Sequence, residues 1–114
     1  MSVNIYDTAN QLEREFRQSE AFVALQNAFA AIENDAVAKK EFEAFKGLTK
    51  KFQHFQETGE QPTEQDLIEA EEISKRAQEN ALILELVKSE QAVSALIGEL
   101  NNIITKPLSE LYNV

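Results

Sequence analysis

The stretch from Asp35 to Thr58 constrains the fold most, because it holds four of the seven phenylalanines in the chain. At about 100° per helical residue, its apolar side chains cover an arc about 140° wide, broader than the roughly 100° stripe that one neighbouring helix covers. The arc contains Ala38, Phe42, Phe45, Leu48, Thr49, Phe52 and Phe55. We therefore expect two neighbours for this helix, one of which a second copy of the chain could supply.

Only three glycines and two prolines interrupt the 114 residues, and strand-like alternation is absent. This composition predicts an all-α fold: an elongated antiparallel bundle of about five helices that forms one domain over residues 1–114. Because long helices in a short chain would expose the broad apolar stripe, we also expect the protein to dimerise. The expected helices span residues 4–17, 20–33, 35–58, 64–79 and 81–105, followed by a short C-terminal tail at 107–114.

Local signals set these boundaries. Asn4, Ser19, Asp35 and Thr63 are residue types that cap helix N-termini. Gly59 readily takes the left-handed conformation that closes a helix. The apolar stripes on either side of Asn80 are roughly 180° out of phase, which predicts a break or kink there, and Pro107 is expected to end the last helix.

The formal net charge of −9 disfavours binding to DNA or to an anionic membrane surface, because both require a surplus of cations. There is no cysteine, which excludes disulfides and Cys-ligated metal or iron–sulfur sites. The first residues have no signal-peptide pattern, and no apolar run reaches the ~18 residues of a membrane span. We therefore expect a cytoplasmic protein.

The chain resembles the YlbF/YmcA family of small bacterial helical proteins, most closely its YheA-like branch. The resemblance lies in the opening NIYDTANQLEREFRQSEAF, the Asn34-Asp35 joint, and the Phe42, Phe45 and Phe52 rhythm. It continues with Gly59 and Pro62, Asn80 followed by LVKSEQAV, and the final KPLSELY.

The resemblance implies long antiparallel helices and a tendency to dimerise. It also implies a non-enzymatic regulatory role, since better-known relatives act in competence, sporulation and biofilm formation within a complex that influences RNA processing. Those relatives hold iron–sulfur clusters through cysteines. This chain has none, so neither the cofactor nor membership of that complex is carried over.

Three features of the sequence are candidate functional sites. His54, the only histidine, lies opposite the phenylalanine arc, and no Glu precedes it by three residues as a di-iron bundle requires; a solvent-facing residue is expected. Glu90 projects into the apolar stripe of the last helix, which predicts a paired structural carboxylate at a dimer seam rather than a catalytic acid. The lysines of the phenylalanine helix could contact RNA, but most lie opposite the aromatic arc.

The sequence thus predicts a non-enzymatic protein that acts as a protein–protein interaction or regulatory adaptor. It is expected to be a homodimer with an unidentified protein partner and to hold no cofactor or metal. The alternative is an RNA-associated accessory factor that uses the lysine-bearing helix face. The candidate core and interface residues are Phe42, Phe45, Leu48, Phe52, Phe55, Ile83, Leu86, Glu90 and Ile97.

Overall fold

The computed structural model describes residues 4–113 and contains five α-helices, with no strand in that range. The all-α class and the five helices expected from the sequence are confirmed. The helices are α1 (Ile5–Arg17), α2 (Glu20–Glu33), α3 (Ala36–Thr58), α4 (Glu64–Glu79) and α5 (Ala81–Tyr112).

Short-range hydrogen bonds fix where the first three helices begin. The Asn4 side chain accepts from the amide of Tyr6 at 3.0 Å, and the Asp35 carboxylate accepts from the amide of Ala38 at 2.9 Å. Between α1 and α2, the Ser19 hydroxyl accepts from the amide of Phe22 at 3.2 Å. Each bond satisfies an amide that has no partner within its helix, and so defines the helix start.

At the boundaries between α3 and α4 and between α4 and α5, one helix ends and the next begins within a few residues. Gly59 closes α3 in the left-handed region at φ 77°, and Thr63 opens α4. Asn80 leaves the helical region with ψ 117°, and its side chain accepts from the amide of Leu82 at 3.0 Å at the start of α5. The chain therefore breaks at Asn80.

The last boundary differs from the prediction. Pro107 lies inside α5, which continues to Tyr112, so the expectation of a helix end near residue 105 is wrong. Proline lacks one amide hydrogen and crowds the carbonyl four residues earlier, here that of Ile103. Ile103 is 69% exposed, so its carbonyl can tilt towards water and the helix continues.

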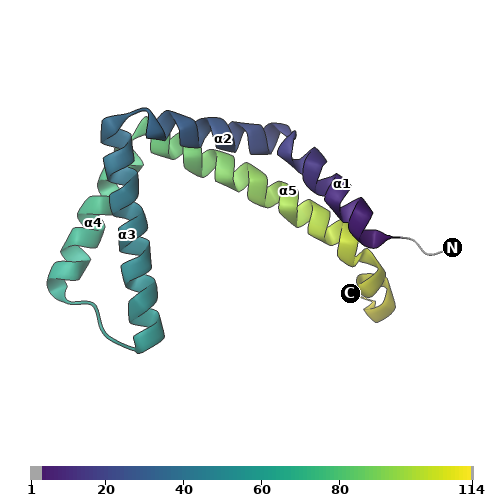
Figure 1. The fold of residues 1–114 in the computed structure, drawn as a ribbon. Helices are drawn as coiled ribbons and strands as arrows, with labels where there is room; N and C mark the ends of the chain where they lie inside the picture. The colour runs from purple at the N-terminus through teal and green to yellow at the C-terminus, as the bar shows by residue number, and fades with distance from the viewer. Residues whose placement is uncertain (1–3, 114) are drawn as a thin grey trace. The chain divides into compact units, whose positions relative to one another are not determined.

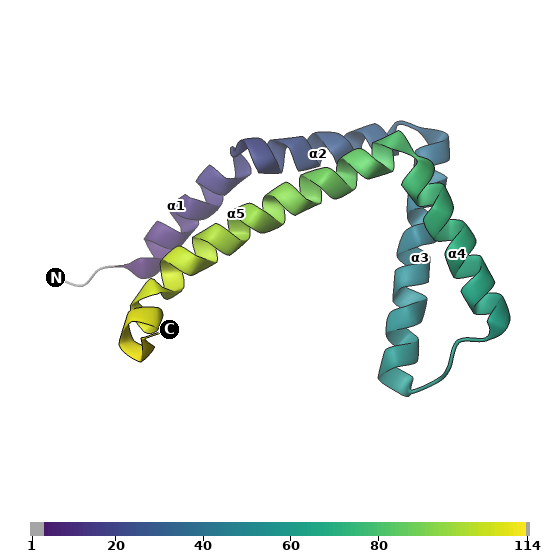
Figure 2. The same cartoon turned by 180° about the vertical axis from the view of Figure 1, so that it is seen from behind.

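The described residues divide into two compact units, and the expected single domain stays a prediction. Unit 1 combines the N-terminal segment through Asn27 with the part of α5 from Lys88 onwards. In both views α1 lies antiparallel beside the C-terminal part of α5 (Figures 1 and 2). The rings of Phe16 and Phe22 join α1 to α2 with centroids 5.2 Å apart, and Val93 of α5 is buried.

Unit 2 covers residues 28–87 and holds the rest of the buried core. In this unit α3 and α4 form an antiparallel hairpin (Figures 1 and 2). At the base of the hairpin, the Asn80 side-chain amide donates to the Glu41 carboxylate of α3 at 3.1 Å. The buried apolar side chains of unit 2 are Ala28, Ile32, Ala38, Ala77, Ile83 and Leu86.

Candidate interaction surfaces

The hairpin of α3 and α4 carries an open apolar groove, here called the hairpin groove, with a volume of about 360 Å³. Phe45 is 38% exposed there, while Leu48 and Phe52 are half-buried. Every side chain that lines the groove is uncharged: Phe45, Leu48, Thr49, Phe52, Gln53, Gln56 and Ala70. Such a surface offers apolar contact and no group for acid–base chemistry.

The remaining phenylalanines of α3 each contact another aromatic ring of unit 2. The Phe42 ring meets the Phe29 ring edge-on at 5.9 Å, and the Phe55 ring meets the Phe52 ring at 5.5 Å. Both Phe42 and Phe55 are half-buried. The helix neighbours within the chain therefore cover only part of the broad aromatic arc.

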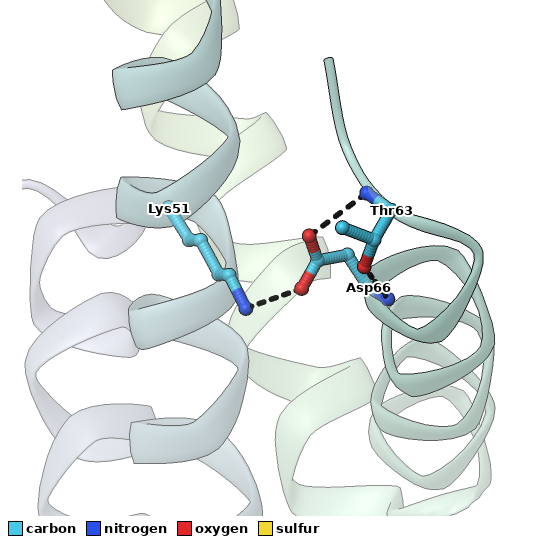
Figure 3. Close-up of polar contacts among 3 residues, drawn as sticks. All are labelled: Lys51, Thr63 and Asp66. Carbon is cyan, nitrogen blue, oxygen red and sulfur yellow. Dashed lines mark hydrogen bonds and ion pairs between the residues drawn. The ribbon is translucent and has the colours of Figure 1, made fainter. Parts of the chain in front are cut away.

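A polar network holds the open end of the hairpin (Figure 3). The Lys51 ammonium donates to one oxygen of Asp66 at 2.6 Å, and the Thr63 amide donates to the other at 2.9 Å. The Asp66 amide in turn donates to the Thr63 hydroxyl at 3.0 Å, completing a capping box. The hydrogen bonds from Lys51 and Thr63 lower the pKa of Asp66 from 3.8 to about 2.

Unit 1 carries a second and larger groove between α1 and α5, here called the terminal groove, with a volume of about 540 Å³. Among its lining side chains, Ile5 is 68% exposed and Ile104 is 71% exposed. Its lining is also free of charged side chains: Ile5, Thr8, Ala9, Leu12, Ile97, Leu100, Asn101 and Ile104. Large exposed apolar side chains gathered in one groove are typical of surfaces that bind another chain.

The candidate residues of α5 separate into two groups. Ile83 and Leu86 are buried in unit 2, whereas Ile97 is 51% exposed and lines the terminal groove. Glu90 is exposed, and within residues 4–113 its carboxylate forms no hydrogen bond or ion pair. The buried polar residue of this helix is its neighbour Ser89, at 6% exposure, so Glu90 does not lie in the buried stripe of this chain.

The other polar candidates lie at the surface. His54 is exposed, as the helical spacing predicts. Two of the five lysines on α3 are paired with carboxylates: Lys51 with Asp66, and Lys39 with Glu33 at 3.2 Å. Within residues 4–113, no cluster of three or more acidic or histidine side chains could hold a metal ion, and no helix is long and apolar enough to cross a membrane.

Sequence reasoning missed the terminal groove. The spacing of Ile5, Ala9 and Leu12 marks an apolar stripe on α1, but it cannot show that α5 leaves this stripe open to solvent. It also missed Ile68, which is 47% exposed on α4.

Comparison with known proteins gives relatives along the whole chain. A UPF0342 protein of Listeria welshimeri is 40% identical over 114 residues, which covers 100% of this chain and 97% of the relative. A UPF0342 protein of Bacillus pumilus is 40% identical over 112 residues, covering 98% and 95%. Both matches extend over unit 1 and unit 2.

Two solved structures share the fold. A protein of unknown function (DUF964) from Bacillus stearothermophilus matches with a TM-score of 0.84 at 29% identity, covering 95% of each chain. The yheA protein from Bacillus subtilis matches with a TM-score of 0.73 at 37% identity, covering 96% of this chain and 100% of that one. Residues 5–109 also match the family described as control of competence regulator ComK, YlbF/YmcA. These matches confirm the resemblance seen in the sequence: the chain belongs to the YlbF/YmcA family.

Proposed function

We propose that this protein is a non-enzymatic regulatory adaptor of the cytoplasm, which acts by binding other protein chains and forms a homodimer. The family description names control of a regulator and no enzymatic reaction, which supports a regulatory role. The observation that carries the proposal is the pair of open apolar grooves, one in each unit. Burying apolar side chains of this kind is the main driving force of protein association.

The grooves also favour binding over catalysis. General acid–base catalysis needs a titratable side chain within reach of a bound substrate, and the linings of both grooves consist of uncharged residues. Glu90, the carboxylate that the sequence singles out, lies exposed and lines neither groove. A partner helix with an apolar face is a better fit to such surfaces than a polar metabolite.

The RNA-associated alternative is less well supported. An RNA-binding helix face needs free cations, and Lys39 and Lys51 are already engaged with carboxylates of their own chain. The net charge of −9 adds a general repulsion of polyphosphate. Protein partners are therefore the better prediction.

Affinity recovery of tagged variants from cells tests the proposal. Ile97→Asp places a charge in the terminal groove, and Ser94→Asp is the matched control, because Ser94 is exposed on the same helix outside the groove lining. Defined proteins recovered with the wild type and Ser94→Asp but lost with Ile97→Asp would support the adaptor role. Recovery abolished by nuclease would favour the RNA alternative, and no specific recovery with any variant would refute the adaptor role.

A further inference from the structure

We propose that the terminal groove binds an amphipathic helix of another protein, a helix whose apolar side carries lysine or arginine at one end. This inference rests on the adaptor role of the proposed function and names the chemistry of the partner that the groove in unit 1 takes. The observation that carries it is an uneven distribution of charge. The charged side chains of α1 and α5 that lie beside the groove are carboxylates, and the unpaired ones gather at one end.

The groove has the length of about two turns of a helix. Ile5 and Leu12 are seven residues apart on α1, and so are Ile97 and Ile104 on α5, which gives about 10.5 Å of rise on each side. Leu12 is 44% exposed and Ile97 is 51% exposed. A helix that docks into a groove of this kind supplies apolar side chains at positions i, i+3 or i+4, and i+7.

On α1, the charged side chains nearest the groove are acidic. At about 100° per residue, Glu15 lies about 70° from the middle of the groove stripe, and Glu13 lies about 90° away on its other side. Asp7 and Arg14 project about 150° or more from that stripe. Arg17 lies about 130° away and is bonded to Glu13 at 2.8 Å. This contact neutralises Glu13 and leaves Glu15 without a countercharge.

On α5, one carboxylate lies in line with the groove. Glu90 is about 30° from the middle of the groove stripe of this helix. The two lysines of α5, Lys88 and Lys106, project about 170° away, on the far side of the helix. Glu99 and Glu110 also project away, at about 130° to 150°. The cations of this helix are therefore not available to a chain bound in the groove.

The two unpaired carboxylates lie towards the same end of the groove. Glu15 follows Leu12 by three residues on α1. Glu90 precedes Ile97 by seven residues on α5. Because α1 lies antiparallel beside the C-terminal part of α5, both carboxylates lie beyond one end, opposite to the end at Ile5 (Figures 1 and 2). Both are exposed, and neither forms an ion pair within residues 4–113.

An apolar groove with unpaired carboxylates at one end is complementary to a helix that has an apolar side and basic residues at one end. A nucleic acid or an anionic membrane would bring more negative charge to these carboxylates. A second copy packed groove against groove would bring no cation to them, because Arg14, Lys88 and Lys106 project from the far sides of their helices. The charges therefore favour a different protein with a basic amphipathic helix.

A phage library of helical peptides with randomised surface positions tests this chemistry without assuming which protein is the partner. The full-length wild type is the bait, and peptides that also bind Ile97→Asp are removed first. We expect the retained peptides to carry apolar residues at i, i+3 or i+4, and i+7, and to be richer in lysine and arginine than the input library. Retained peptides that are neutral or acidic, or no retained peptide, would overturn the inference.

A matched pair of charge variants locates the basic end of a retained peptide, by fluorescence anisotropy at low salt. Glu15→Lys with Glu90→Lys reverses the two unpaired carboxylates, and should weaken binding by about tenfold or more. Glu99→Lys with Glu110→Lys makes the same change of net charge on the side of α5 away from the groove, and should weaken binding by about twofold at most. Equal losses with the two pairs would reveal only a general attraction to an acidic protein and would overturn the inference. Circular dichroism checks that each variant keeps its helices.

Recovery from cells separates this inference from the proposed function. Protein partners that Ile97→Asp loses but Glu15→Lys with Glu90→Lys keeps would leave the adaptor role and overturn only the basic partner. A wild-type dimer that Ile97→Asp converts into a monomer would show a second copy in the groove, which overturns this inference and leaves the homodimer. No specific recovery with any variant, together with no retained peptide, overturns both.

Discussion

Leu86 and Val87 are consecutive residues of α5 with opposite burial, which makes them a matched pair for testing the core of unit 2. Leu86 is 1% exposed, whereas Val87 is 43% exposed. Truncating a fully buried leucine to alanine removes its apolar contacts and leaves a cavity, at a cost of about 3 kcal/mol within a range of roughly 2–5. We therefore expect Leu86→Ala to be strongly destabilising.

The size of the thermal shift follows from the length of the chain. With about 2.1 cal/mol/K of unfolding entropy per residue, 114 residues give about 0.24 kcal/mol/K. A loss of about 3 kcal/mol then lowers the melting temperature by about 12 °C. Val87→Ala removes atoms that are already half in water, so it should cost less than about 1 kcal/mol, or about 4 °C.

Circular dichroism at 222 nm during heating and urea titration measures both variants at one fixed protein concentration, so that any association affects them equally. Far-ultraviolet spectra at low temperature show whether each variant still forms its helices. Equal shifts for Leu86→Ala and Val87→Ala would refute the burial described for the start of α5.

Further predictions concern the residues that end α3 and begin α4 in the hairpin. Thr63→Ala removes the cap of α4 and should cost about 1 kcal/mol in urea unfolding. Gly59→Ala should cost about 1 kcal/mol, because alanine at φ 77° is strained; no loss would contradict the left-handed closure. The pKa of Asp66 is lowered to about 2, so its stabilisation is complete above pH about 4 and is lost as the pH falls towards 2. Asp66→Asn should remove that loss from the pH dependence of urea unfolding, and an unchanged dependence would argue against the Lys51 contact.

Sequence reasoning worked well where the decisive contact is local. The side chains of Asn4, Asp35 and Thr63 each accept a hydrogen bond from a backbone amide no more than three residues away. Gly59 ends α3 through its own left-handed backbone conformation. Such contacts depend on residue type and spacing alone. The order of helices and the turn of the hairpin follow from them.

The buried side of α5 could not be predicted from residue type and spacing alone. The helix has apolar side chains on more than one side, and averaging them put Glu90 at the centre of the predicted stripe. The buried side is set by which neighbours cover the helix, and it includes Ser89 and Val93 rather than Ile97. The terminal groove escaped prediction for the same reason, since a groove is defined by what a neighbour leaves uncovered.

The proline within α5 has a consequence for the end of the chain. Beyond Pro107 the final turns are joined to the rest of the helix by one bond fewer, and Leu108, Leu111 and Tyr112 are 57–76% exposed. Their amides should exchange with deuterium far sooner than those preceding Thr105, whose hydroxyl donates to the carbonyl of Asn101 at 2.8 Å. We therefore expect the turns after Pro107 to open and re-form independently of the part of α5 that precedes them in unit 1.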